Sequence, residues 1–308
     1  MSVRRRSIAV ALMCVTTAIS IAGQQRRPRL QGMWLNDTAT PLERPAAFAG
    51  KAFATPEEAL EYEKRYLLDR TLAISLDKEF ELDAAGDLDT YDRGHLLPGR
   101  RTSMIVEPTD GRVPALTSEA RRGLDERAEH IAQHYADNPE DLRNADRCLV
   151  VGNSSVPPML PVFYNNLVQI VLTDDAVMIL SEMIHDVRII PLDGRPHLPP
   201  SIRQWKGDSV GHWEGDTLVV DTTNFTDNTP LRGSSRSLHV SERFTATTAD
   251  TLTYRFTIDD PASFVHSWTG ESLMTRTDDR MFEYACHEAN YSMFNVLRGA
   301  RYREQHGR

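Results

Sequence analysis

The second half of the chain is a succession of short segments rich in Val, Ile, Thr, Phe and Tyr, separated by tight polar turns. Segments of this length and composition, bounded by Asp, Gly, Asn or Pro, are typical of β-strands. About eight of them follow one another with no helical pattern in between, so we expect antiparallel neighbours in a meander. In chain order the expected strands are CLVVG, VQIVL, AVMILSEMIHDVRII, DTLVVDTTNF, SLHVSERFTAT, TLTYRFTIDD, SFVHSWTGESLMTRT and MFEYACHE.

An open meander of this size has two exposed edges, and closure into a barrel removes them. We therefore predict a mainly β protein in which the antiparallel meander closes into a lipocalin-like β-barrel, with an N-terminal helical region packed on it. A β-sandwich is the alternative. Two proline-rich loops, 154–166 and 194–211, interrupt the meander. Because prolines restrict a loop to few conformations, we expect these loops to shape the mouth of a cavity.

Two segments before the meander have helical patterns. ATPEEALEYEKRYLLDR begins with Thr55 as N-cap, followed by a proline and two glutamates, which suit the first turn of a helix. In residues 116–137 apolar side chains recur at helical spacing, namely Ala120, Leu124, Ala128, Ile131 and Tyr135. The expected organisation is a signal peptide (1–22), an extended arm (23–54), a helical region (55–147) packed on the barrel, and the barrel itself (148–308).

The N-terminus predicts export. Three arginines at positions 4–6 precede an apolar run, and Ser20 and Ala22 provide small residues for cleavage, as in secretory signal peptides. Cleavage removes three arginines and no acidic residue, which takes the formal net charge from −9 to about −12. We expect a periplasmic or secreted protein with no membrane span after cleavage. An acidic chain without a basic stripe is a poor nucleic-acid binder, and the sequence predicts no oligomeric state.

The mature chain keeps two cysteines, Cys148 and Cys286. In an oxidising compartment we expect a structural disulfide between them. A catalytic thiol is the lesser alternative, because nothing nearby in the sequence indicates a lowered thiol pKa. His130 and His134 have the spacing of metal ligands but lie beside glutamates on a polar helix face, which favours a solvated surface. Because the chain has no short metal-binding or nucleotide-binding motif, we expect neither a metal nor another cofactor.

Residues 207–211, Gly-Asp-Ser-Val-Gly, match the G-x-S-x-G pattern of a serine-hydrolase nucleophile elbow. That elbow needs a strand before the serine and a helix after it. Here a proline-rich loop comes before Ser209, and a turn and a β-run follow it. We therefore expect loop structure at Ser209, with a nucleophilic serine as a minor hypothesis.

The segment MILSEMIHDVRII mixes charged and aliphatic residues in an unusual way. If it is one strand, alternation places Glu182, Asp186 and Arg188 on one face and His185 on the other. Buried charges are costly unless they are paired. We expect the three charged side chains to neutralise one another inside the barrel, or to neutralise a ligand. A structural salt-bridge network and a functional site are both open.

Other strands offer side chains for the same interior. Glu242 shares a face with apolar neighbours, Tyr284 lies on the expected last strand, and His212 lies ahead of a strand. Carboxylates, a tyrosine and an arginine among apolar groups suit a small amphiphilic or apolar ligand. If His185, His212 or His287 also faces the interior, proton transfer to and from that ligand becomes possible.

Several stretches resemble a family of exported bacterial proteins of uncharacterised activity: TPLERPAAFAGKAF, RRTSMIVEPTDGRVPALT, EMIHDVRIIPLDGRPHLPP, GDSVGHWEGDTLVVDTTNFTD and YACHEANY. Together they cover most of the mature chain. The family usually has YACHEGNY at the end, where this chain has Ala289. The resemblance implies a single exported unit and assigns no activity and no catalytic residue.

Three functional hypotheses follow. The first is an exported enzyme performing metal-free acid–base chemistry of lyase, isomerase or cyclase type on a small, partly apolar molecule. The residues expected to take part are His185, Glu182, Asp186, Arg188, His212 and Tyr284, with a histidine–carboxylate pair moving the proton and the arginine pairing with a substrate anion. The second is a non-catalytic small-molecule-binding protein, and the third is a serine hydrolase using Ser209. A histidine and a carboxylate about 3 Å apart inside the barrel would favour the first hypothesis, whereas a filled interior with paired charges would oppose it.

Overall fold

The structure is a computed structural model that describes residues 27–75, 94–162, 164–229, 231, 233–288 and 290–307. The predicted signal peptide, residues 1–22, lies outside the described residues. None of the helices within the described ranges has both the length and the apolar character needed to cross a membrane.

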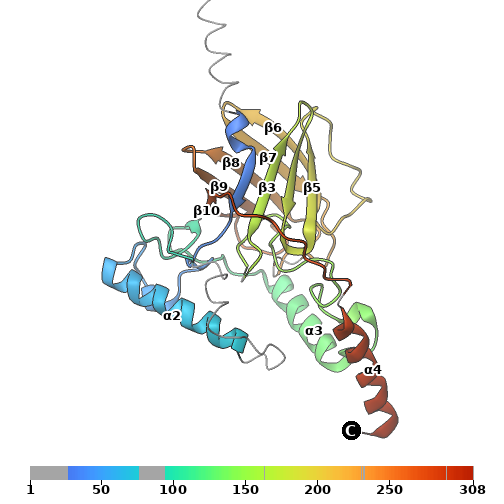
Figure 1. The fold of residues 1–308 in the computed structure, drawn as a ribbon. Coiled ribbons are helices and arrows are strands. Elements are labelled where there is room, and N and C mark those ends of the chain that lie inside the picture. The colour runs from blue at the N-terminus through green and yellow to red at the C-terminus, as the bar shows by residue number, and fades with distance from the viewer. Residues whose placement is uncertain are drawn as a thin grey trace, which may run out of the picture.

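The described part of the chain forms a nearly closed antiparallel β-barrel (Figure 1), as the sequence predicted, with nine strands where about eight were expected. Around the barrel the strands follow the order β5 (Asp186–Pro191), β4 (Ala176–Ser181), β3 (Leu167–Leu172), β1 (Gly32–Leu35), β10 (Trp268–Arg276), β9 (Thr251–Asp259), β8 (His239–Ala246), β7 (Thr217–Thr223) and β6 (Asp208–Glu214). A short strand, β2 (Ile105–Glu107), pairs with β10 beside this path.

Alternation of apolar and polar residues determines which face of each strand is buried. In β9 every second side chain, from Leu252 to Ile258, is fully buried, as expected for strands with one face on the core. Five of the largest buried side chains come from the neighbouring strands β1, β10, β9 and β8 and pack into the interior: Trp34, Trp268, Tyr254, Phe244 and Phe256. Residues 150–160 add Val150, Val156 and Met159 to the same core.

The segment MILSEMIHDVRII is not one strand, in contrast to the sequence prediction. It forms the end of β4, a 3₁₀ turn η5 (Met183–His185) and then β5, so that the chain reverses direction. Ile184 and His185 have φ of 61° and 46°, a left-handed conformation that β-branched residues rarely adopt. The buried face of β5 carries Arg188 and Ile190, whereas Val187 and Ile189 point outward.

Four further elements differ from the expectation. CLVVG and MFEYACHE form no strand, and the alternation assigned to Tyr284 therefore does not apply. Residues 208–214, expected to begin as loop, form the edge strand β6. The expected extended arm, 23–54, supplies β1, which lies between β3 and β10. The barrel is therefore built from more of the chain than residues 148–308.

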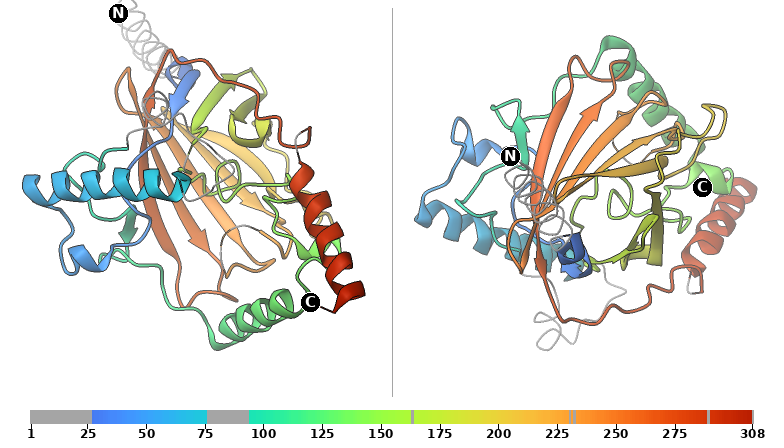
Figure 2. Two further views of the ribbon diagram at one scale, coloured as in Figure 1. Left: turned by 60° about the horizontal axis from the view of Figure 1, so that its bottom comes forward. Right: turned by 90° about the horizontal axis from the view of Figure 1, so that it is seen from above.

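Three α-helices lie outside the ring of strands: α2 (Pro56–Ser75), α3 (Ser118–His134) and α4 (Tyr291–His306) (Figure 2). The sequence predicted α2 and α3 but not α4. Thr55 caps α2 as expected, because its hydroxyl accepts the N–H of Glu58 while the Glu58 carboxylate accepts the N–H of Thr55. The other 3₁₀ turns are η1 (Arg27–Leu30), η2 (Ala46–Phe48) and η4 (Pro139–Asp141).

Cys148 and Cys286 form a disulfide that spans 138 residues. It ties the segment before α4 to the loop that follows η4. The pair packs with Met183 and Ile184 of the η5 turn. A disulfide is compatible with an oxidising compartment.

Candidate functional site

The barrel has a seam between β5 and β6, the two ends of the strand order. Over their described residues these strands form no hydrogen-bonded ladder with each other, yet they approach closely at one point. A Cβ added to Gly211 on β6 would lie 2.8 Å from Cγ2 of Ile190 on β5. Glycine at this position therefore allows the Ile190 side chain to close the seam at that level.

A pocket of about 220 Å³ opens at the seam. Its polar lining has three cationic side chains, Arg188, Arg195 and Lys206, and one carboxylate, Asp208. Val187, Ile189, Pro191, Pro196 and Leu198 supply apolar walls. Much of the lining comes from the proline-rich loop 194–211, as its sequence predicted. Cationic groups beside apolar walls favour a ligand with an anionic and an apolar part.

Arg188 connects this pocket to a buried network inside the barrel. Its Nη1 and Nη2 donate to both carboxylate oxygens of Glu242 on β8, at 3.1 and 2.6 Å. Tyr254 Oη donates to the same carboxylate at 2.8 Å and accepts the N–H of Met159. Both charged side chains are at least 96% buried. This two-point geometry is the strongest form of an arginine–carboxylate pair.

Burial and charge shift the proton affinities of this network. Burial, supported by the negative charge of Glu242, raises the pKa of Tyr254 well above its ordinary value. Burial by itself would lower the pKa of Arg188, but the attraction of Glu242 outweighs it and the pKa is raised. The arginine is therefore cationic and the tyrosine is neutral throughout the physiological range.

The protein does not provide an acceptor for every hydrogen-bond donor of the Arg188 guanidinium. Nη2 also lies 3.3 Å from Oγ of Ser209, which in turn bonds Thr222. Nε is buried and has no hydrogen-bond partner among the described residues. An unmet buried donor is costly, so this part of the seam favours an additional acceptor.

A chain of imidazoles and carboxylates lies at the rim of the pocket, on the outer face of β6, β7 and β8. His197 contacts Asp208 through Nδ1 and Asp221 through Nε2, each at 2.9 Å. His239 Nε2 lies 2.6 Å from the second oxygen of Asp221. Through Asp208 the chain fixes the loop 194–206 against the barrel, because Asp208 also accepts the N–H of Leu198.

We expect this rim to make stability depend on pH. The hydrogen bond with Asp221, opposed by burial, raises the pKa of His239. The hydrogen bond with His239, opposed by burial and supported by His197, lowers the pKa of Asp221. The stabilisation is complete between the ordinary pKa values of about 3.9 for Asp and 6.5 for His. It is lost as the pH rises through the raised value of His239, and as it falls through the lowered value of Asp221.

Urea unfolding of His239→Gln at pH 5.5 and pH 9 tests this expectation. Because both side chains are more than one third exposed, screening limits the effect to under about 1 kcal/mol. The variant should be less stable than the wild type at pH 5.5 and nearly equal at pH 9. An equal difference at both pH values would contradict the expectation.

The six residues that the sequence suggested for acid–base chemistry do not lie together in the structure. Only Arg188 lines the seam pocket. Glu182 is buried and accepts the N–H of Phe282 at 2.9 Å. His185 is exposed, with Nδ1 3.1 Å from the carbonyl oxygen of Tyr284. These contacts fasten the segment before α4 to the η5 turn.

The remaining residues lie in three different surroundings. Asp186 accepts hydrogen bonds from Ser155 at 2.6 Å and from Lys206 at 2.8 Å, and through Lys206 it borders the pocket. Tyr284 stacks on Tyr164, whose pKa is raised to about 12 by burial and by its hydrogen bond with Tyr284. His212 is exposed on the outer face of β6 and pairs with Glu214.

All ten histidines lie within the described residues, and none of them is buried. The condition for proton transfer inside the barrel is therefore not met. The described residues also contain no group of three or more His, Cys, Asp or Glu side chains arranged to hold a metal ion. At the pocket itself, the histidine in contact with the lining is His197, through Asp208.

Ser209 lies in the middle of β6, with no helix behind it. Its hydroxyl bonds Thr222 and lies near the Arg188 guanidinium. His212, the partner considered for it, is on the opposite face of the same strand by alternation. No strand–helix elbow forms around this G-x-S-x-G.

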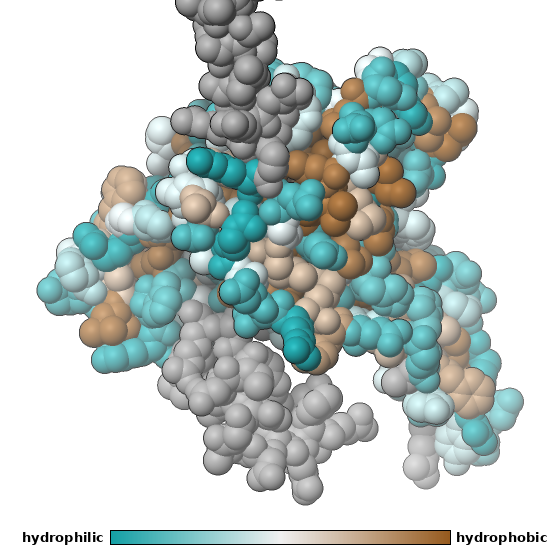
Figure 3. Space-filling model, turned by 45° about the horizontal axis from the view of Figure 1, so that its top comes forward, coloured by the Kyte–Doolittle hydropathy of each residue, from teal (hydrophilic) through white to brown (hydrophobic). Residues whose placement is uncertain are grey.

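An apolar patch extends from the pocket over the outer face of β3, β4 and β5. Ile189 lies opposite Met178, and Val187 lies opposite Leu180; Val171 on β3 lies opposite Met178. Ile189 is 67% exposed and Val187 39%. Hydrophobic side chains form a brown area on this side of the barrel in Figure 3. We refer to these five residues as the outer apolar patch.

Sequence reasoning missed Tyr254, Lys206 and the rim chain. The signal for the rim was present, since Asp221 and His239 alternate with apolar residues and therefore point outward. Their meeting depends on the register between β7 and β8, which periodicity alone does not determine. No family model, curated protein or solved structure matches this chain.

Proposed function

We propose that this protein binds a small amphiphilic anion at the seam between β5 and β6. The observation that carries the proposal is Arg188, a buried guanidinium that lines the pocket and has an unpartnered Nε among the described residues. Lys206 and Arg195 add positive charge to the lining, and their carboxylate partners, Asp186 and Asp193, are not part of it. The lining therefore presents three cationic groups and one carboxylate, and each cation is also paired with one carboxylate outside the lining, namely Glu242, Asp186 or Asp193.

The size of the pocket indicates how the ligand is arranged. A dry cavity of about 150 Å³ is enough for benzene, so 220 Å³ accommodates an anionic group and the first few carbons. The rest of an alkyl or aromatic tail would lie on the outer apolar patch, where each buried Å² contributes about 25 cal/mol. The protein need not open its packed interior to bind such a molecule.

Calorimetric titration with decanoate, and with decanol as a neutral control, tests this proposal. Lys206→Met should weaken decanoate binding about tenfold, or ~1.4 kcal/mol, and leave decanol unchanged. Ile189→Asn should weaken both ligands. Arg243→Gln on the outer face of β8 is the matched control and should change neither affinity. Failure of decanoate to bind, or equal binding of decanoate and decanol, would contradict the proposal.

Acid–base catalysis at the same pocket is the second candidate function. It is favoured by Asp208, which lines the pocket and contacts His197. The two side chains could exchange a proton with a ligand held by Arg188. Untargeted mass spectrometry of small molecules incubated with the wild type or with His197→Gln tests it. A conversion lost in the variant supports catalysis, and unchanged mixtures in both samples leave only binding.

A further inference from the structure

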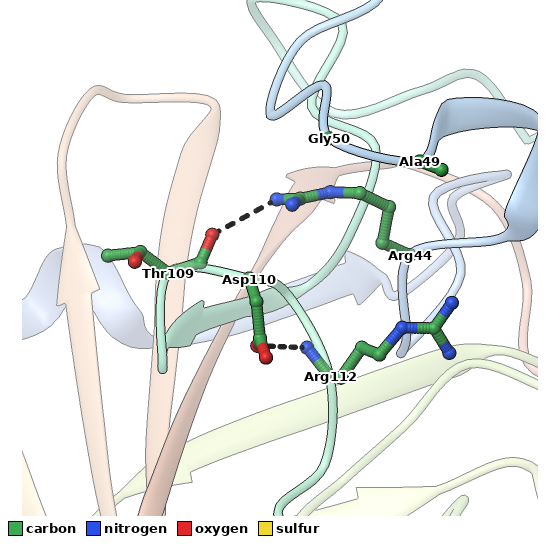
Figure 4. A pocket seen from close by; sticks show the side chains of 6 residues that line it. All are labelled: Arg44, Ala49, Gly50, Thr109, Asp110 and Arg112. Carbon is green, nitrogen blue, oxygen red and sulfur yellow. Dashed lines mark hydrogen bonds between the residues drawn. The ribbon is translucent and has the colours of Figure 1, made fainter.

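A second cavity, of about 420 Å³, lies away from the seam, between the loop after η2 and the loop after β2. Arg44, Arg112 and Asp110 are the charged residues in its lining (Figure 4). The two loops belong to the stretches LERPAAFAGK and EPTDGR, which the proposed function does not use. They are brought together by backbone hydrogen bonding from Arg44 N to the carbonyl of Gly111 at 2.8 Å.

Arg44 is only 8% exposed, and its contacts fix the guanidinium in place. Nε donates to Oγ1 of Thr102 at 3.1 Å, and Nη2 donates to the carbonyl oxygen of Thr109 at 3.3 Å. A Cβ on Gly111, which has a φ of +71°, would lie 2.9 Å from Nη2. Glycine at position 111 therefore lets the backbone pass directly beside the guanidinium.

The charge of Arg44 is not balanced by the protein. None of the ion pairs formed by arginines among the described residues includes Arg44. Both of its hydrogen-bond acceptors are neutral. A buried charge without a partner is strongly unfavourable. Asp110 does not fill this role, because its carboxylate accepts the N–H of Arg112 and is turned away from Arg44 in Figure 4.

We infer that this cavity is an oxyanion-binding site in which Arg44 is the anchor and the exposed Arg112 of the same lining adds positive charge. The free edge of a guanidinium recognises two oxygens of one phosphate, sulfate or carboxylate group. The volume exceeds what a single such group occupies, so the class of ligand is a small organic phosphate, sulfate or carboxylate. This inference does not depend on the function proposed for the seam.

Titrations of the full-length mature protein with inorganic phosphate, sulfate and succinate, each matched in ionic strength with NaCl, test the site. At least one of these anions should raise the melting temperature above the NaCl control, because it binds only the folded state. Arg112→Gln should weaken that anion roughly tenfold, and Arg44→Met should abolish its effect. Asp110→Asn removes the opposing charge and keeps an acceptor for the Arg112 N–H, so it should strengthen binding.

The melting temperatures of two variants test whether Arg44 binds an anion or only supports the fold. If Arg44 is an anion anchor, Arg44→Met removes an unbalanced buried charge and should not lower the melting temperature in anion-free buffer. Ala49→Glu, at an exposed position in the lining, places a carboxylate in the cavity and should raise the melting temperature while preventing phosphate binding. The inference is overturned if no anion acts beyond NaCl, or if Arg44→Met keeps the anion effect.

Discussion

Arg188→Met is expected to lower the free energy of unfolding by about 3–5 kcal/mol, since it leaves the carboxylate of Glu242 buried without its partner. Glu242 is fully buried, and its remaining donor is Tyr254 Oη. Methionine has a similar volume to the arginine stem, so loss of packing contributes little to this figure. Urea unfolding followed by tryptophan fluorescence measures the change.

A comparison of Arg188→Met with the double variant Arg188→Met, Glu242→Leu distinguishes two contributions to the free energy of unfolding. One is the cost of leaving Glu242 buried without its partner, and the other is the net contribution of the intact ion pair. Replacing both members of a buried ion pair by apolar residues is often neutral or stabilising. We therefore expect the double variant to lie within about 2 kcal/mol of the wild type, much nearer than the single variant. A double variant as unstable as Arg188→Met would show that packing around Arg188, and not charge, dominates. A single variant within about 1 kcal/mol of the wild type would also contradict the expectation.

Cys148→Ala with Cys286→Ala is expected to cost about 2–5 kcal/mol. The disulfide closes a long loop, since its cysteines have a sequence separation of 138, and loop closure restricts the unfolded chain more as the loop lengthens. Its loss also removes the covalent link that holds the segment before α4. Unfolding of the variant, compared with the oxidised and the reduced wild type, measures this contribution.

Limited trypsin digestion shows whether the loss is local or global. α4 contains Arg298, Arg301 and Arg303 as cleavage sites. Its noncovalent contacts include the hydrogen bonds from Arg301 to the carbonyls of Ala136 and Asp137 and a small hydrophobic cluster around Ala300. In the disulfide-free variant we expect cleavage in α4 well before cleavage in the barrel. Unchanged resistance of α4, together with unchanged stability, would assign the anchoring to those noncovalent contacts.

The regular strands were predictable because their periodicity and their turns agree. β8 and β9 have clean alternation and a polar turn between them, and the inward residues Glu242 and Phe244 of β8 are those that alternation selects. The reversal at Ile184 and His185 was not predictable in the same way. Two non-glycine residues adopt a left-handed backbone there, and the sequence has no glycine, proline or asparagine to announce a turn.

The candidate site was predictable only in part. Arg188 was correctly expected inside the barrel with a carboxylate partner. The partner is Glu242, 54 residues further along the chain, and not the neighbouring Glu182 or Asp186, because those residues belong to the turn and to the strand's start. Which distant strand faces β5 depends on how the barrel closes, and this is a property of the tertiary fold that local pattern does not contain.

The seam between β5 and β6 follows from the odd number of strands in the barrel. All neighbouring strands along the order from β5 to β6 run antiparallel, and with nine described strands the first and the last then point the same way. Antiparallel closure is impossible for an odd number, so the ring needs either a parallel junction or a tenth strand. Over the described residues β5 and β6 form no parallel ladder, and the junction that is left open lies beside Arg188.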